Sequence, residues 1–309
     1  MPEPSEPGPA LADAVPAPQE EAAPQPDAAS APSFKDSLRH APLTFVLAAI
    51  NVAVFLWAER TGSTERTAVL LQFGAAERVH VWAGEPWRLV TSTFLHIGWI
   101  HLLWNTYASV GWCVAVERVL GSRRFLFVYL VSGIGGACAS VLFHEAVSAG
   151  ASGAMFGIVA MTLILRRRML PDWDAFFQDR GVRTTLINIG LWTVLGLTAF
   201  AMDNYAHGGG FVVGAAAAWI LTDRRVGRGT WFAFAAAFAL LFVAALRPWW
   251  HPTVEEGQLV TEFAERYRTG EDLPMDRGRA ERISERGCRA GVKSACNELD
   301  LLRPDRRDR

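Results

Sequence analysis

The segment Gly150-Ala151-Ser152-Gly153-Ala154-Met155-Phe156-Gly157 opens a short hydrophobic stretch that the arginines at 166–168 close. The helix that starts at Ser152 has about 14 residues before these arginines, so it covers roughly 21 Å of a ~30 Å hydrocarbon core. A spanning helix that begins this late places Ser152 below the membrane surface, beside unpaired amide N–H groups. In a water-filled cavity this hydroxyl could be a nucleophile next to an oxyanion site. The alternative is packing, because Gly153 and Gly157 form a GxxxG pattern.

The 309 residues divide into four parts by composition. Residues 1–40 hold more than half of the 16 prolines and no apolar run, so we expect a disordered, acidic, cytoplasmic tail. Residues 41–228 are mostly apolar segments with short polar gaps, and residues 229–248 add another apolar segment. Residues 249–309 are dense in charge of both signs and predict a soluble helical tail. The net charge of −1 gives no indication of a nucleic-acid partner.

Seven apolar segments are candidates for membrane spans, which predicts an all-α polytopic membrane protein. They lie at about 43–58, 100–117, 124–146, 152–165, 184–202, 205–222 and 230–247. The links after the second, fourth and sixth segments are rich in arginine. By the positive-inside rule these links are cytoplasmic, so the N-terminus is cytoplasmic and, after seven spans, the C-terminal tail is extracytoplasmic.

This orientation places a histidine on the same side of the membrane as Ser152. His207 lies near the outer start of the sixth segment, and Gly210 and Gly214 form a second GxxxG pattern behind it. If the two glycine faces pack together, His207 meets Ser152. An imidazole beside a serine hydroxyl is the minimum for acyl-transfer catalysis. The alternative is a histidine whose hydrogen bond is made by a backbone carbonyl.

A second polar cluster enters the membrane from the outer side on the second segment. His101 and Asn105 are four residues apart, so they share one helical face, and both can donate a hydrogen bond to an oxyanion without carrying charge. His96 precedes them and could support the site. The alternative is a metal site with His144 and Glu145, but the spacing of five between the first two histidines fits no standard zinc helix motif.

These patterns together resemble the rhomboid intramembrane serine proteases. HxGxxHLxxN (residues 96–105), GASGAMFG (residues 150–157) and AHGGGxxxG (residues 206–214) follow one another on the second, fourth and sixth segments. The resemblance covers roughly residues 43–225 and implies a rhomboid-like six-helix core plus one C-terminal transmembrane helix. It also implies an intramembrane serine endopeptidase that hydrolyses peptide bonds in or near transmembrane segments with a Ser–His dyad and no cofactor.

The resemblance assigns a role to each candidate residue. Ser152 would be the nucleophile and His207 the general base. The oxyanion hole would consist of His101, Asn105 and the backbone N–H of Ser152. Supporting residues would be His96, Gly150, which gives the loop its bend, and Gly153. The family uses a dyad, so Asp203 either caps the sixth helix or orients the base.

The same resemblance implies transmembrane protein substrates, a lipid bilayer as surroundings and a bacterial inner membrane as location. The substrate and the oligomeric state stay open. Two other functions compete: a rhomboid-like protein that binds transmembrane helices without cutting them, and a histidine-lined transporter or metal protein. In the tail, an extracytoplasmic location permits a disulfide between Cys288 and Cys296, whereas a cytoplasmic one leaves both thiols free.

Overall fold

The computed structural model describes residues 34–144, 146–198, 202–223, 225, 227–246 and 253–303. Over these residues the regular structure is helical, with one isolated antiparallel bridge between Ala76 and Ser148. The elements in chain order are α1 (Phe34–His40), α2 (Pro42–Thr61), α3 (Thr67–Phe73), α4 (Arg78–Trp82), α5 (Arg88–Thr91), η1 (Ser92–Phe94), α6 (Gly98–Leu120), α7 (Ser122–Phe143), α8 (Ser152–Met169), α9 (Trp173–Gln178), α10 (Arg180–Thr198), α11 (Asn204–Thr222), α12 (Arg228–Ala245), α13 (Val254–Thr269), α14 (Arg277–Arg289) and α15 (Lys293–Leu302).

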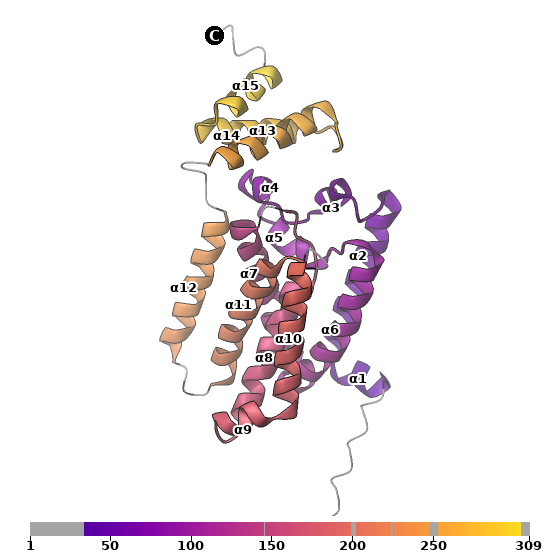
Figure 1. The fold of residues 1–309 in the computed structure, drawn as a ribbon, viewed down its shortest axis with the longest axis vertical. Coiled ribbons are helices and arrows are strands. Elements are labelled where there is room, and N and C mark those ends of the chain that lie inside the picture. The colour runs from indigo at the N-terminus through magenta and orange to yellow at the C-terminus, as the bar shows by residue number, and fades with distance from the viewer. Residues whose placement is uncertain are drawn as a thin grey trace, which may run out of the picture.

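The long helices form one bundle, with α7, α8 and α11 packed against one another at its centre (Figure 1). The short elements α3, α4 and α5 lie at one end of this bundle, and α13–α15 lie beyond them, whereas α1 and α9 lie at the opposite end (Figure 1). Each of the seven predicted apolar segments contains one long helix, so the predicted helical architecture is confirmed.

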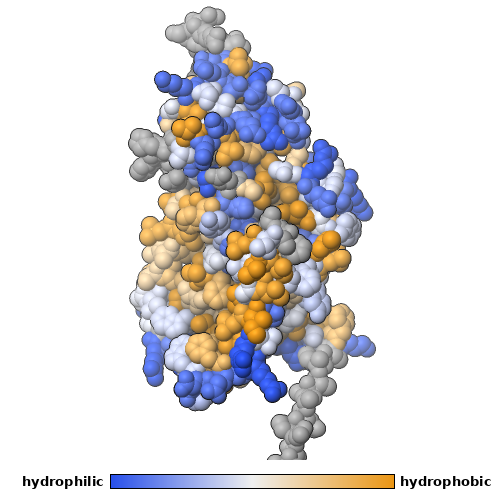
Figure 2. Space-filling model, viewed as in Figure 1, coloured by the Kyte–Doolittle hydropathy of each residue, from blue (hydrophilic) through white to orange (hydrophobic). Residues whose placement is uncertain are grey.

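On the face shown in Figure 2, apolar residues cover the middle of the bundle, and polar residues gather at both ends. Among the described residues, three helices are long and apolar enough to cross a membrane by length and composition alone: α2, α7 and α12. Helix α8 does not qualify, because its 18 residues include the three arginines at 166–168; it ends at Met169, four residues past the predicted end at 165. Arginine is a good helix former, and Arg166 and Arg168 have partners in Asp179 (3.2 Å) and Asp223 (3.4 Å).

The GxxxG pattern of α8 (Gly153 and Gly157) lies in direct contact with that of α11 (Gly210 and Gly214). The same glycines therefore pack the two helices together and set the distance between their first turns. A Cβ atom added at Gly210 would overlap the carbonyl group of Gly153, and one added at Gly214 would overlap the backbone of Gly157. Helices α8 and α11 therefore touch backbone to backbone along two turns. Helix α7 approaches the same place, because a Cβ atom on Gly136 would lie 3.4 Å from the Cα of Gly153.

A buried carboxylate joins three helices at the end of the bundle where α1 lies. Glu117, near the end of α6, has no exposed surface and accepts hydrogen bonds from the amides of Leu43 (3.0 Å) and Thr44 (2.8 Å). It also accepts from the hydroxyls of Thr44 (2.7 Å) and Ser122 (2.5 Å). One side chain thus satisfies free N–H groups in the first turn of α2 and joins α2 and α7 to α6.

The segment 1–40, which the sequence predicts to be disordered, is helical at its end. Its last seven residues form α1, because the ring of Phe34 packs edge-on against Phe45 at 5.4 Å and Asp36 pairs with Arg118 at 2.8 Å. These contacts join α1 to α2 and α6, although Phe34 itself is 69% exposed. Residues 1–33 lie outside the described part of the chain.

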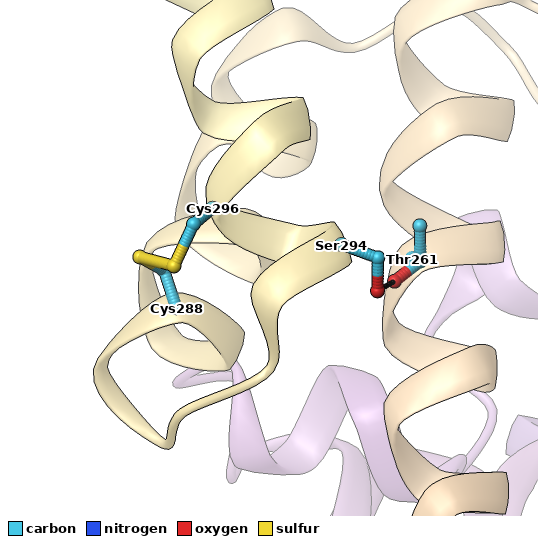
Figure 3. The surroundings of a disulfide bond; sticks show 4 residues. All are labelled: Thr261, Cys288, Ser294 and Cys296. Atoms are coloured by element: carbon cyan, nitrogen blue, oxygen red, sulfur yellow. Dashed lines mark hydrogen bonds between the residues drawn. A yellow bond between two sulfur atoms is a disulfide. The ribbon is translucent and has the colours of Figure 1, made fainter.

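The charged tail is a three-helix unit, α13–α15. Cys288, near the end of α14, and Cys296, near the start of α15, form the expected disulfide (Figure 3). The hydroxyls of Thr261 and Ser294 lie 2.7 Å apart and join α13 to α15 (Figure 3). A Thr253–Glu256 capping box begins α13.

The glycine contact between α8 and α11 predicts unequal effects of two identical substitutions. Gly214→Ala should destabilise the protein by about 1–3 kcal/mol, since the new methyl group forces two backbones apart. Gly208→Ala, on the same helix, meets no atom within 4 Å, so its effect should be neutral to slightly stabilising. Thermal unfolding in detergent measures both. Equal unfolding midpoints would contradict the close contact.

Candidate active site

The first turns of α8 and α11 bring a serine and a histidine into direct contact. The Nε2 atom of His207 lies 2.9 Å from the Oγ atom of Ser152. The histidine is 6% exposed, and the glycine contact one turn further along sets the spacing of the two helices. If the hydroxyl donates this hydrogen bond, Nε2 is the acceptor and the ring proton resides on Nδ1. This tautomer is the one that can take the hydroxyl proton.

The ring of Phe156 restricts the orientation of the His207 imidazole. The two rings stack, with centroids 4.3 Å apart and planes 10° from parallel. Phe156 is four residues after Ser152 and therefore lies on the same face of α8. Asp203 caps α11 by accepting from the amide of Ala206 at 2.9 Å, and its carboxylate lies 3.7 Å from His144 Nδ1. The capping alternative for Asp203 is thus realised in the structure.

A second histidine faces the loop that leads to the serine. The amide of Ile97 donates to Nδ1 of His101 at 3.2 Å, so the ring proton of a neutral His101 resides on Nε2. A Cβ atom added at Gly150 would lie 3.1 Å from this Nε2 and 3.6 Å from Ser152 Oγ. An N–H donor of His101 is therefore directed at the space beside the serine.

Glycine is required at position 150, where the loop passes close to the ring of His101, for two reasons. Its φ angle is +147°, which residues with a side chain rarely adopt. A Cβ atom there would also lie 2.9 Å from Cε1 of His101. At the start of α8, the amide of Ser152 has no carbonyl one turn earlier in the helix, so it stays available as a donor.

The remaining two predicted residues lie close to the pair without contacting it directly. Asn105 is buried, and its Nδ2 donates to the carbonyl of His101 at 3.0 Å, one turn earlier on α6. The ring of His96 is buried 5.3 Å from that of His101. In the described part of the chain, no group of three His, Cys, Asp or Glu residues is arranged to hold a metal ion, and Glu145 lies outside that part.

The loop before the serine is held by backbone hydrogen bonds that the sequence did not reveal. Ala76 and Ser148 exchange two of them, of 3.0 and 2.8 Å, and the amide of Gly150 donates to the carbonyl of Ser92 at 2.9 Å. Ala76 and Ser92 thus hold one side of the loop before Ser152, residues 146–151. Among side chains, Phe156 has no role predicted from the sequence, although its spacing of four from the serine is a visible signal.

Known proteins are similar in sequence to large parts of this chain. Residues 83–224 match the model of the Rhomboid domain. The chain is 36% identical to Rhomboid protease GluP of Bacillus subtilis (strain 168) over 234 residues, 74% of this chain and 44% of that protein. It is 35% identical to RHOMBOID-like protein 2 of Arabidopsis thaliana over 161 residues, 51% of this chain and 50% of the relative.

A further relative, Rhomboid-like protease 2 of Toxoplasma gondii, is 32% identical over 167 residues, 53% of this chain and 57% of that protein. The chain thus spans about half the length of these relatives. With an all-helical bundle, apolar residues over its middle and this domain match, the protein is a polytopic helical membrane protein with a rhomboid domain.

The geometry predicts that Ser152 is unusually reactive. A serine-directed fluorophosphonate should label the folded protein at Ser152, because His207 can accept the proton as the oxygen attacks phosphorus. His207→Gln, which keeps a polar side chain but not the base, should reduce labelling by about 100-fold or more. Mass spectrometry of the labelled peptide measures the site, and Ser294 in the tail is the internal control for non-specific reaction. Labelling of both serines at the same rate would contradict an activated hydroxyl.

Proposed function

We propose that the chain is an intramembrane serine endopeptidase that cleaves transmembrane proteins in or near their membrane-spanning segments. The observation that supports it is the 2.9 Å contact between Ser152 Oγ and His207 Nε2, at the start of two helices inside a rhomboid domain. The nearby N–H groups add the second element that acyl transfer needs, a site for negative charge.

In the proposed reaction, Ser152 Oγ attacks the scissile carbonyl carbon while His207 Nε2 takes the hydroxyl proton. The carbonyl electrons move to oxygen, which is stabilised by the amide of Ser152, by His101 Nε2–H and by an N–H of Asn105. Collapse of this intermediate breaks the C–N bond, and the imidazolium gives its proton to the leaving amine. Water then attacks the acyl-enzyme, with His207 again as base, and restores the serine.

The membrane surroundings restrict the substrate. Peptide hydrolysis needs water, so the site must open to the aqueous phase at the end of the bundle where α8 and α11 begin. A substrate helix must also unwind locally, because its carbonyl groups are hydrogen-bonded. Gly, Pro or other weak helix formers near the scissile bond lower this cost. By analogy with the family, α10 is the lateral gate; it meets α6 through Trp104 and Trp192, whose rings lie 4.7 Å apart.

We further propose a membrane arrangement in which residues 41–228 are the rhomboid core, residues 229–248 form a seventh span and residues 249–309 are extracytoplasmic. The clustering of arginine at the end of α8 supports a cytoplasmic location for that end. The tail packs at the opposite end, and its disulfide suits an oxidising compartment. A bacterial inner membrane fits the bacterial origin of the relative matched over 234 residues.

Cleavage of a model transmembrane substrate by the purified protein tests the activity. Ser152→Ala and His207→Ala should abolish cleavage, whereas Asn105→Ala should slow it by about 10- to 1000-fold, since one oxyanion donor is lost and others remain. Chelators should leave the rate unchanged. Binding of the substrate without cleavage by the wild type would favour the non-cutting alternative, and inhibition that added metal reverses would favour a metal protein.

The topology is tested with thiol chemistry on intact cells. If the tail is extracytoplasmic, an impermeant reductant followed by an impermeant maleimide should label Cys288 and Cys296, and omission of the reductant should prevent labelling. The control is the double variant Cys288→Ser/Cys296→Ser, which retains only the buried Cys113 and Cys138. Labelling that appears only after lysis would place the tail in the cytoplasm.

A further inference from the structure

The C-terminal tail is attached to the loop region between α2 and α6 by a shared hydrophobic core. Leu71, Val79 and Trp82 from the loop region pack in one buried cluster with residues of α13–α15, among them Phe263 and Ile283. Figure 1 shows the tail directly against α4. The tail is therefore a packed part of the protein at the end of the bundle where α8 begins.

Polar contacts between tail and loop region surround the hydrophobic cluster. The hydroxyl of Tyr267 lies 2.7 Å from His80 Nε2, and the guanidinium of Arg286 donates to the carbonyl of Trp82. His80 is fully buried, and its Nδ1 lies 2.5 Å from Glu77. These contacts align α13 and α14 with α4 at defined positions rather than through apolar contact alone.

The strongest connection is a buried carboxylate with cations on both sides. Glu85, 6% exposed, pairs with Arg88 of the loop region at 2.7 Å. Its other oxygen pairs with two residues of α14, Arg279 at 2.8 Å and Arg282 at 3.5 Å. Burial acts to raise the pKa of Glu85, but Arg88 and Arg279 outweigh it and hold this pKa below the ordinary value. The carboxylate is therefore ionised at neutral pH.

Arg88 connects this ion-pair cluster to the backbone beside the nucleophile loop, which we define as residues 146–151 before Ser152. Its Nη1 donates to the carbonyls of Leu71 and Ala75, both at 2.9 Å. The next residue, Ala76, forms the backbone bridge to Ser148, four residues before Ser152. A short series of contacts thus runs from α14 through a carboxylate and a guanidinium to the loop that carries the serine.

We propose that Arg279 and Arg282 are positioning residues, an inference that rests on the proposed function. Through them the tail holds the nucleophile loop in place. The contacts that connect the two run through Glu85, Arg88 and the Ala76–Ser148 bridge. The tail then contributes to turnover without touching the substrate. Loss of the two cations leaves Glu85 with one partner and frees its side chain to move, so Arg88 no longer holds the two carbonyls at one position.

The test compares Arg279→Met/Arg282→Met with Arg289→Met in the full-length protein. Arg289 lies on the same helix but is 77% exposed and pairs within α14, with Glu285. We expect the double variant to lower kcat and the rate of fluorophosphonate labelling by about tenfold, with KM within about twofold, because a small misplacement of a reacting group costs this much or more. The Arg289 variant should match the wild type, and Arg279→Lys should retain most of the activity because it keeps the charge.

Hydrogen exchange supplies a readout that does not depend on catalysis. Amides in peptides covering residues 71–76 and 146–151 should exchange faster in the double variant than in the Arg289 variant, while those of α7 and α11 stay protected. If exchange and kcat are the same in both variants, or if only KM changes, the positioning role is wrong. If the wild type cleaves nothing yet exchange increases as expected, the proposed activity fails and the structural link from tail to loop stands.

Discussion

The backbone contact between α8 and α11 is the constraint on which the rest of the structure depends. Lipid offers no hydrophobic driving force for helix association, so close van der Waals contact must supply it. Glycines at 153, 157, 210 and 214 allow this contact because no side chain separates the two backbones. The hydrogen bond between Ser152 and His207 exists because the helices approach this closely one turn away.

The polar groups of the site suit the interior of a membrane, where a charged group has a high free-energy cost. The contact of Ile97 with His101 puts the ring proton of a neutral imidazole on the side facing the loop, so a donor is available without an ionised group. The stacking of Phe156 restricts the ring of His207 without another polar group. The contacts around the serine in the structure are thus neutral hydrogen bonds and ring stacking.

Charge is instead concentrated at the two ends of the bundle. Glu85, Arg88 and Arg279 lie between the loop region and the tail, and the arginines of α8 lie at the other end of the bundle. At the loop end, buried ion pairs join two segments that are distant in sequence. Such pairs are weak sources of stability but strict about geometry, which fits a role in holding one arrangement of the loop.

The sequence by itself determined the seven long helices and the start of α8 at Ser152, and it displayed the two glycine faces that could meet, because apolar length and small-residue spacing are local properties that one chain displays directly. It did not indicate α1, the Phe156 stack, the Ala76–Ser148 bridge or the docking of the tail on Glu85. Only the tertiary structure decided these. Arg279 and Glu85 are 194 residues apart, and no periodicity links them. Their contact depends on how the shapes of two folded units fit together, which composition and spacing do not encode.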